Sequence, residues 1–313
     1  RRQGDRWRTT HAWKSLVTAG VQATPIGEED IVTGTEGPID PVGEKIDFSS
    51  VQWGSVEWTN LCLLYLRACE SRLEKPILGD DLAARDIARI DYDFARMHRV
   101  LRPGINQFMV ALRSAQFDAM AAEYLKGHPD AVVLHLGCGL HSRAFRMAVP
   151  AGGPWFDVDL PTVIELRRKL HSETQNYRMV GSSVTEPGWI EGLPTGGPVL
   201  IVAEGLLMYI TPAEVTELLH RLLDRFDHGE LIADFLSPWG PRMSKIFTHG
   251  LIKWGTRDGT EVPRWDSRLH LVEDSPIMAG VDRIPLTPQR LLYRTQFALP
   301  AVRNYDRIFR YTF

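Results

Sequence analysis

The stretch VVLHLGCGLHSRAFRM, residues 132–147, constrains the fold more than any other part of the sequence. It begins as an apolar run typical of a buried strand, turns at Gly137-Cys138-Gly139 and continues in a helix-like pattern. In a doubly wound sheet, ligands bind outside the carboxyl ends of the strands. A glycine there has no Cβ, so the backbone can approach a ligand closely. The stretch therefore predicts an α/β fold with a ligand site at this turn.

Strand-like and helix-like segments alternate along this half of the chain. Apolar runs predict five strands, over 131–136, 154–160, 176–182, 198–206 and 229–236. Pro161 suits the first turn of a helix, and Thr211 with Glu214 forms a capping box ahead of apolar residues at helical spacing. The alternating pattern of 305–313 predicts a terminal antiparallel strand. The whole order predicts a mostly parallel sheet with helices on both faces.

The length and the changes of pattern define three regions. A chain of 313 residues suits one α/β domain with an added cap. We expect residues 1–45 to form a polar tail with little packed structure, because they are rich in charge, Gly and Pro without periodicity. We expect 46–126 to form a helical cap. Residues 127–313 then form the core, with an insertion at about 237–290.

The composition argues against several kinds of partner. A net charge of −3 provides no attraction toward nucleic acid or an anionic membrane. Cys62, Cys69 and Cys138 show no metal-ligand spacing, which favours reduced thiols, a cytoplasmic location and no metal site. No apolar run has the length of a membrane span.

Two carboxylates and a serine indicate which ligand binds at the turn. Asp159 ends the second strand, twenty residues after Gly139, where a carboxylate can accept hydrogen bonds from a ribose diol. NAD and S-adenosylmethionine both contain that adenosine. The dinucleotide fingerprint requires a third glycine where this chain has Ser142, which weakens the NAD interpretation. Glu204 ends an apolar strand and needs a partner, either a bound ammonium group or an arginine of the core.

The segments LHLGCGLHSRAFRM, FDVDLPTVIELRRKL, SSVTEPGWI and VAEGLLMYI together resemble the signature segments of leucine carboxyl methyltransferase-like enzymes. They are similar in particular to bacterial polyketide carboxyl O-methyltransferases of the tetracenomycin type. The resemblance runs from about residue 47 to the end of the sequence. It implies a class I S-adenosylmethionine-dependent methyltransferase: a Rossmann-like, mostly parallel seven-stranded sheet with an N-terminal helical cap and an insertion after the fifth strand.

The resemblance also implies roles for individual residues. Arg113 would pair with the methionyl carboxylate, and the glycine turn would face the methionyl end of the cofactor. Asp159 would bind the ribose hydroxyls, and Ser183 and Val184 would lie beside the adenine. Glu204 would lie near the methionyl amine. The full expected cofactor-binding set is Arg113, Gly137, Cys138, Gly139, Asp159, Leu160, Ser183, Val184, Glu204 and Gly205. Arg143 and Arg146 are expected only to brace the helix after the turn. Two positions depart from the family pattern, because His141 and Ser183 stand where acidic residues are usual.

The expected reaction is methyl transfer to an oxygen of a small, polyketide-like acid or phenol. A carboxylate is already ionised at pH 7, so its methylation needs alignment and no strong base. A phenol would require a base, and Tyr209, His98 or His141 are the candidates. Acceptor contacts are predicted, against the alternative of plain core packing, for Tyr209, Phe235, Trp239 and Trp254.

Other interpretations stay open at this stage. Methylation of a protein C-terminal carboxylate fits the same family. An NAD-dependent oxidoreductase and a non-catalytic relative that binds a partner fit the sequence less well. A homo-oligomer is compatible with every one of them.

Overall fold

The computed structural model describes residues 45–147, 153–247 and 250–313, so the expected tail lies almost entirely outside the described residues. Within them, the N-terminal region is helical. Side chains at the helix starts explain where three of these helices begin, because Ser55, Asp80 and Asp93 each accept a hydrogen bond from a backbone N–H of the first turn. The elements are β1 (Ile46–Asp47), α2 (Val56–Ser71), α3 (Asp81–Arg89), β2 (Ile90–Asp91), α4 (Phe94–Leu101) and α5 (Pro103–Gly127).

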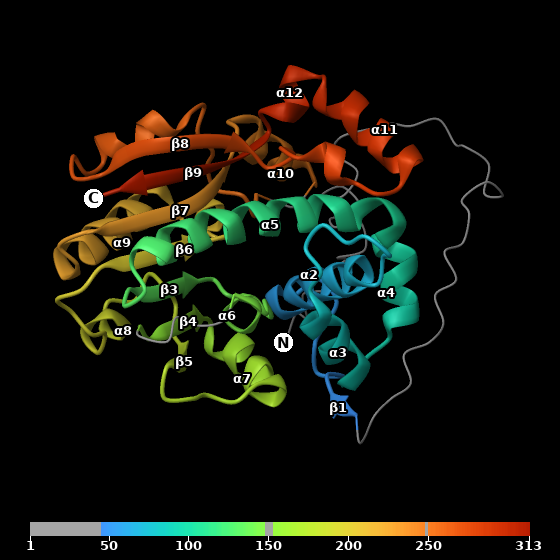
Figure 1. The fold of residues 1–313 in the computed structure, drawn as a ribbon, viewed down its shortest axis with the longest axis horizontal. Coiled ribbons are helices and arrows are strands. Elements are labelled where there is room, and N and C mark those ends of the chain that lie inside the picture. The colour runs from blue at the N-terminus through green and yellow to red at the C-terminus, as the bar shows by residue number, and fades with distance from the viewer. Residues whose placement is uncertain (1–44, 148–152, 248–249) are drawn as a thin grey trace, which may run out of the picture.

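A seven-stranded sheet forms the core, in the order β5-β4-β3-β6-β7-β9-β8 (Figure 1). Its first five strands are parallel, and β9 is antiparallel to both β7 and β8. The expected mostly parallel sheet and the antiparallel terminal strand are confirmed. The strands are β3 (Val132–Leu136), β4 (Trp155–Asp159), β5 (Tyr177–Gly181), β6 (Val199–Ala203), β7 (Gly229–Leu236), β8 (His270–Pro276) and β9 (Asp306–Thr312).

Helices cover both faces of this sheet. Successive residues of β3 point to opposite faces of the sheet and enter two different apolar clusters. Leu134 packs in the cluster beneath α9, and Val133 packs in the cluster beneath α5. The predicted capping box is present at α9, where Thr211 and Glu214 bond each other's backbone N–H groups. The other helices of this region are α6 (Arg143–Arg146), α7 (Pro161–Leu170), α8 (Gly188–Glu191), the short 3₁₀ helix η1 (Leu207–Tyr209) and α9 (Pro212–Arg225).

The segment after β7 contributes a strand as well as a covering. It was expected to be an insertion over the edge of the sheet, but β8 is itself the edge strand. Its sequence HLVEDSP has no apolar run to reveal it, because an exposed edge strand favours charged residues. The segment contains α10 (Trp239–Phe247), η2 (Gly259–Arg264), β8 and η3 (Val281–Arg283), and α11 (Thr287–Phe297) and α12 (Pro300–Arg303) follow.

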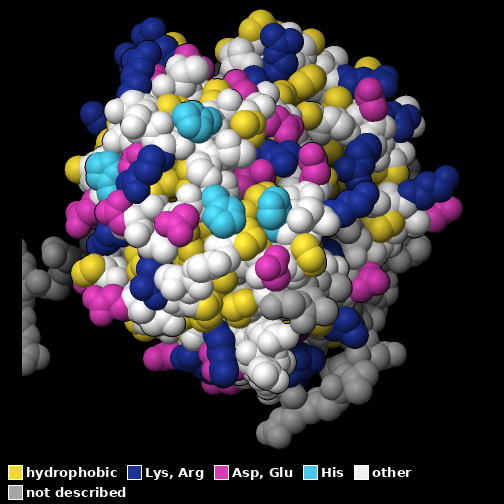
Figure 2. Space-filling view, turned by 60° about the vertical axis from the view of Figure 1, so that its left-hand side comes forward, with side chains coloured by type: hydrophobic (Ala, Val, Ile, Leu, Met, Phe, Trp, Pro, Cys, Tyr) yellow, Lys and Arg dark blue, Asp and Glu magenta, His cyan; other side chains and the backbone are white. Residues whose placement is uncertain are grey.

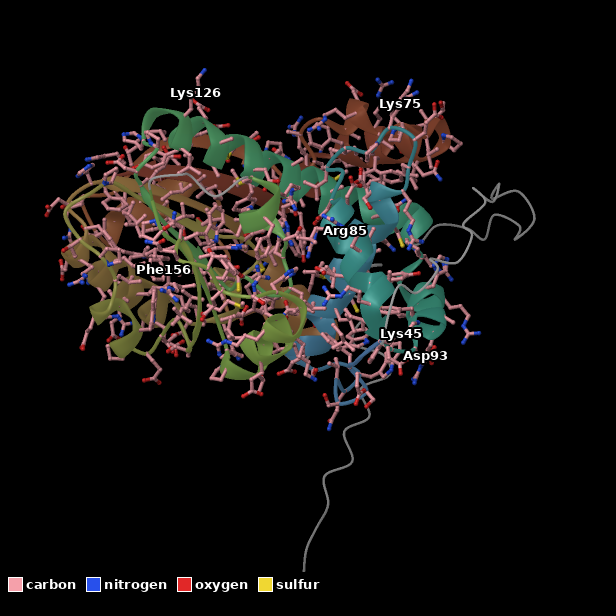
Figure 3. All side chains as sticks on the ribbon, turned by 60° about the horizontal axis from the view of Figure 1, so that its bottom comes forward. Lys45, Lys75, Arg85, Asp93, Lys126 and Phe156 are labelled. Carbon is pink, nitrogen blue, oxygen red and sulfur yellow. The ribbon has the colours of Figure 1, made fainter. Side chains whose placement is uncertain are left out.

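The cap packs against the loops at the carboxyl ends of the strands (Figure 1). Arg67 of α2 donates a hydrogen bond to the Leu140 carbonyl, just after the glycine turn. Arg89 of α3 bonds the carbonyl of Leu170 at the end of α7. Figure 3 shows Lys45, Arg85 and Asp93 together on the cap side, away from Phe156 of β4. Among the described residues, no helix is both long and apolar enough to cross a membrane.

Candidate active site

The glycine turn has the backbone geometry that the sequence indicates. Gly137 and Gly139 have φ angles of 62° and 51°, in the left-handed region that favours glycine. A Cβ on Gly139 would lie 2.7 Å from Oδ1 of Asn60, a side chain of α2. A Cβ on Gly137 would lie 2.9 Å from Cδ1 of Leu206. The side chains of Asn60 and Leu206 therefore pack directly against the two glycines. Cys138 is buried, and burial raises the pKa of its thiol well above the usual value, so the thiol stays protonated.

Asp159 lies directly beside this turn. Its Oδ2 accepts the N–H of Gly139 at 2.7 Å and its Oδ1 accepts the N–H of Leu160 at 2.7 Å. Burial raises the pKa of Asp159, although these two N–H groups oppose that effect. Each carboxylate oxygen can accept more than one hydrogen bond, so both can still accept a hydroxyl group. The carboxylate thus fixes the turn and remains able to bind a diol.

The expected adenine-side residues follow β5. The hydroxyls of Ser183 and Thr185 are 2.8 Å apart. Val184 is buried, and its carbonyl accepts the indole N–H of Trp189. Leu160, by contrast, is 38% exposed at the start of α7. Ser183 and Leu160 thus lie at neighbouring strand ends, since β5 pairs with β4.

Glu204 has protein partners on every side. Its Oε1 accepts Nε of Arg113 and the hydroxyl of Ser114, each at 2.9 Å, and its Oε2 pairs with Nη2 of Arg143. Burial alone would raise the pKa of Glu204, but Arg143 and Arg113 hold it far below its usual value. The core arginines that the sequence left as an alternative are therefore real partners of Glu204.

We expect this ion pairing to make the fold acid-sensitive. The pKa of Glu204 and that of Asp157, which Arg167 and His135 contact, are both lowered in the folded protein despite burial. A lowered pKa adds stability that is complete above the unfolded value and is lost as the pH falls. The contribution of these two carboxylates to stability should therefore be complete above about pH 5, and the free energy of unfolding in urea should decline from about pH 5 toward about pH 3. A constant free energy of unfolding over that range would contradict the assignment.

Glu204 belongs to a longer alternating series of charges, which we call the arginine–carboxylate chain. Arg143 and Arg146 were expected only to brace their helix. Instead both form ion pairs with Asp118 of α5, and Arg146 also reaches Asp80 of the cap, because their short helix lies between cap and sheet. Successive ion pairs join Arg67, Asp80, Arg146, Asp118, Arg143, Glu204, Arg113 and Asp234.

The structure does not support His141 as a general base. The side chain is buried, its Nδ1 accepts the N–H of Arg143, and its Nε2 lies 3.2 Å from the hydroxyl of Ser114. Burial and the nearby Arg67 hold the pKa of His141 well below its usual value. Both ring nitrogens thus take part in hydrogen bonds within the protein. His98, the other histidine considered, hydrogen-bonds Tyr65 within the cap.

The four residues predicted to contact the acceptor separate into two groups. Phe235 and Trp254 are buried, their ring centroids are 5.0 Å apart, and they belong to the apolar core. Their predicted contact with an acceptor is not supported, because the interior already covers both rings. Trp239, which begins α10 just beyond β7, is 60% exposed. Tyr209 packs against Met208, and burial raises the pKa of its phenol, so it is not available as a base at neutral pH.

Several residues of the site escaped the sequence analysis. Asn60 covers the glycine turn from α2, and Ser114 bonds both Glu204 and His141. Asp234 is buried in the middle of β7, where it accepts the N–H of Gly205 at 2.6 Å. A signal existed for Asp234, since it is a carboxylate within the apolar run GELIADFL. No local pattern marks Asn60 or Ser114.

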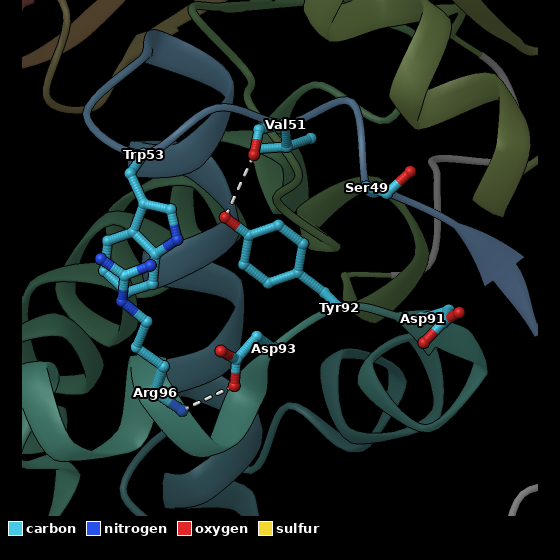
Figure 4. A pocket seen from close by; sticks show the side chains of 7 residues that line it. All are labelled: Ser49, Val51, Trp53, Asp91, Tyr92, Asp93 and Arg96. Carbon is cyan, nitrogen blue, oxygen red and sulfur yellow. Dashed lines mark hydrogen bonds between the residues drawn. The ribbon is translucent and has the colours of Figure 1, made fainter.

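A separate hollow lies within the cap, between the segment after β1 and the start of α4 (Figure 4). There the guanidinium of Arg96 stacks over the ring of Trp53 at 4.1 Å, and Tyr92 bonds the carbonyl of Val51. Its lining includes none of the expected cofactor-binding residues: it consists of Ser49, Val51, Trp53, Asp91, Tyr92, Asp93 and Arg96. Elsewhere, the face shown in Figure 2 carries basic and acidic side chains interspersed.

Comparison with known proteins identifies the family. The family model for leucine carboxyl methyltransferase matches residues 61–223, which is more than half of the chain. The tetracenomycin polyketide synthesis O-methyltransferase TcmP of Streptomyces glaucescens is 37% identical over 274 residues, or 84% of this chain and 99% of that protein. The chain belongs to the leucine carboxyl methyltransferase family.

Two further comparisons agree. The S-adenosyl-L-methionine-dependent methyltransferase dpfgK of Gibberella zeae is 32% identical over 198 residues, or 59% of this chain and 66% of that protein. The crystal structure of a methyltransferase candidate from Thermobifida fusca YX aligns with a TM-score of 0.51 and 17% identity, over 79% of this chain and 93% of that one. That second likeness supports the fold alone.

The comparisons confirm the class I methyltransferase fold and the enzyme class, an S-adenosylmethionine-dependent O-methyltransferase, with S-adenosylmethionine as its cofactor. The residues present fit that cofactor. The glycine turn has left-handed backbone angles and no Cβ at Gly137 or Gly139, and the carboxylate of Asp159, at the end of β4, lies beside it. The NAD interpretation has no support from the relatives. Among the residues that the structure describes, no three or more His, Cys, Asp or Glu side chains are grouped so that they could hold a metal ion.

Proposed function

We propose that this family member methylates the carboxylate of a small, aromatic, polyketide-like acid. The observation that supports a carboxylate is the state of the three side chains considered as bases. His141 is hydrogen-bonded through both nitrogens, His98 bonds Tyr65, and Tyr209 is a half-buried phenol with a raised pKa. A carboxylate needs no such base, because it is already ionised at neutral pH.

We propose that different residues of the site bind different parts of the cofactor. When bound, S-adenosylmethionine supplies a methyl group on a positively charged sulfur, which the acceptor oxygen attacks in line. Asp159 would accept hydrogen bonds from the ribose hydroxyls, and Ser183 and Val184 would border the adenine. Arg113 would hold the methionyl carboxylate by its planar pair of N–H groups, and the glycine turn would leave room for the methionyl end.

The acceptor is proposed to lie beyond the end of β7. Trp239 is the exposed aromatic residue there, and the Arg242 guanidinium lies 5.3 Å from its ring centroid. A flat ring could pack on the indole of Trp239 while its carboxylate points toward the cofactor. The alignment of oxygen, methyl and sulfur then provides the catalysis, since positioning can supply a large part of a displacement barrier.

A mass-spectrometric assay with a deuterated methyl donor tests this proposal. We expect an aromatic carboxylic acid to gain one methyl group, and the matched phenol and carboxamide to gain none. Mild alkali should remove the methyl group, because it cleaves an ester and leaves an aryl ether intact. A peptide that ends in a leucine carboxylate serves as the arm for protein methylation.

The Trp239→Ala variant provides the comparison within the chain. We expect a KM for the aromatic acid about tenfold higher, from the lost ring contact, with an unchanged Kd for S-adenosylmethionine. Alkali-stable methylation of the phenol, or modification of the peptide alone, would refute the proposed acceptor class.

A further inference from the structure

The arginine–carboxylate chain is balanced, with four guanidinium groups and four carboxylates in alternation. Because the signs alternate, each charge has an oppositely charged neighbour. Buried charges need such a partner, since an unpaired charge in the protein interior is costly. The series ends at Asp234, whose Oδ2 lies 3.5 Å from Nη1 of Arg113. A further carboxylate next to that end would therefore have no arginine of its own.

Asp306 is that further carboxylate. It is the first residue of β9 and pairs in register with Leu236, the last residue of β7. Because β9 runs antiparallel to β7, this start lies at the carboxyl edge of the parallel strands, where ligands bind. The Oδ1 atom of Asp306 is buried and has no hydrogen-bond partner among the described residues.

The titratable groups around Asp306 come from several elements. They are Asp234 of β7, Arg113 of α5, Glu204 after β6 and the phenol of Tyr209, with Tyr305 beside it in sequence. Burial raises the pKa of Asp306 well above its usual value, and Asp234 raises it further, while Arg113 only partly opposes both. Burial likewise raises the pKa of Asp234 to about 6. These directions, together with the unpartnered Oδ1, favour protonation of Asp306 over protonation of Asp234 in the free protein.

We propose that Asp306 is a specificity-determining residue that favours the positively charged methyl donor over its uncharged product. The inference rests on the proposed placement of the donor beside Arg113 and Glu204. S-adenosylmethionine carries a sulfonium, an ammonium and a carboxylate, and so one net positive charge. S-adenosylhomocysteine has lost the sulfonium charge and is neutral overall. The negative charge of the Asp306 carboxylate, which has no arginine partner, can compensate the net positive charge of S-adenosylmethionine. S-adenosylhomocysteine has no such charge to compensate.

The exchange is balanced in charge. As the donor binds, the proton of Asp306 passes to solvent, and the carboxylate left behind compensates the donor's charge in a region of low dielectric constant. When the methyl group has left, the same carboxylate is again in surplus and takes up a proton. Donor affinity should consequently rise with pH, by up to about tenfold per pH unit while Asp306 titrates. Product affinity should not change with pH for this reason.

Isothermal titration calorimetry of the full chain measures this exchange directly. Titrations from pH 6 to pH 9, each in two buffers of different ionisation enthalpy, give the number of protons released. We expect release approaching one proton with S-adenosylmethionine and almost none with S-adenosylhomocysteine. Sinefungin, whose added amine replaces the sulfonium charge, should behave as the donor does. Equal release for donor and product in the wild-type protein would overturn the proposal, and this comparison needs no variant.

The isosteric Asp306→Asn variant tests the residue itself. We expect it to abolish the proton release and to lower the preference for donor over product by about tenfold, through the loss of one nearby charge. Asp130→Asn, at an exposed aspartate, should keep both properties. If Asp306 were instead a base for a hydroxyl acceptor, its variant would lose turnover with proton release unchanged, which would overturn the proposal. If the proposed donor site were wrong, Arg113→Met would leave donor binding unaffected. This result differs from a loss of proton release and from a loss of turnover in Asp306→Asn, so the two proposals can fail separately.

Discussion

Asp159→Ala is expected to raise the Kd for S-adenosylmethionine by about a hundredfold, which corresponds to about 2.7 kcal/mol. Two effects combine in that loss. The variant removes the proposed acceptor of the ribose hydroxyls, and it frees the N–H groups of Gly139 and Leu160, which hold the turn in place. Charge-assisted hydrogen bonds of this kind are about twice as strong as neutral ones. Equilibrium dialysis with labelled S-adenosylmethionine provides the measurement.

Two matched variants make the result interpretable. Asp159→Asn keeps an oxygen that can accept one of the two N–H groups, so we expect an intermediate affinity. Asp227→Ala replaces an exposed aspartate and should bind as the wild-type protein does. The same affinity in Asp159→Ala as in the wild type would show that the ribose lies elsewhere.

Arg143→Met should lower the free energy of unfolding by about 3–5 kcal/mol, because it leaves a buried carboxylate without its partner. Arg143 is fully buried, and its guanidinium contacts Glu204, Asp118 and Nε2 of His135. Methionine fills a similar apolar volume, so the loss measures the charge rather than a cavity. Chemical denaturation at neutral pH, with circular dichroism as the probe, gives the value.

A double variant separates the ion pair from the packing. Arg143→Met combined with Glu204→Gln removes both charges, so it should be more stable than Arg143→Met alone. Arg303→Met, at an exposed arginine of α12, should change stability by less than about 0.5 kcal/mol. If the double variant were as unstable as the sum of its parts, the pairing of Arg143 with Glu204 would not be the source of the effect.

Local signals in the sequence predicted much of the fold. The bounds of β7 agree with the expected 229–236, and the capping box at Thr211 marks the start of α9. Asp159 could be predicted as a site residue because it lies twenty residues after Gly139, at the end of the next strand. This spacing is typical of the acidic residue that binds ribose in such folds. The individual cofactor-binding roles stay predictions, since they depend on a bound molecule.

Contacts between distant segments could not be predicted in this way. Arg67 and Asp80 reach Arg146 and the Leu140 carbonyl across the cap boundary, and Arg113 meets Asp234 from a helix far away in sequence. Neither partner carries a local pattern that names the other. Phe235 and Trp254 illustrate the same limit, because an aromatic side chain that packs in the core has the same sequence signal as one that binds a ligand.

The arginine–carboxylate chain has a consequence for how an acceptor reaches the cofactor. Arg146 and Ser142 of the core both bond Asp80 of the cap, and the side chains that meet there are buried or nearly so. Swinging the cap outward would separate these charges before water could surround them, which is costly. These contacts therefore hold the cap in a fixed position against the core. If the acceptor binds beside Trp239, as proposed, it and the methylated product would pass the exposed indole at the start of α10, without an outward movement of the cap.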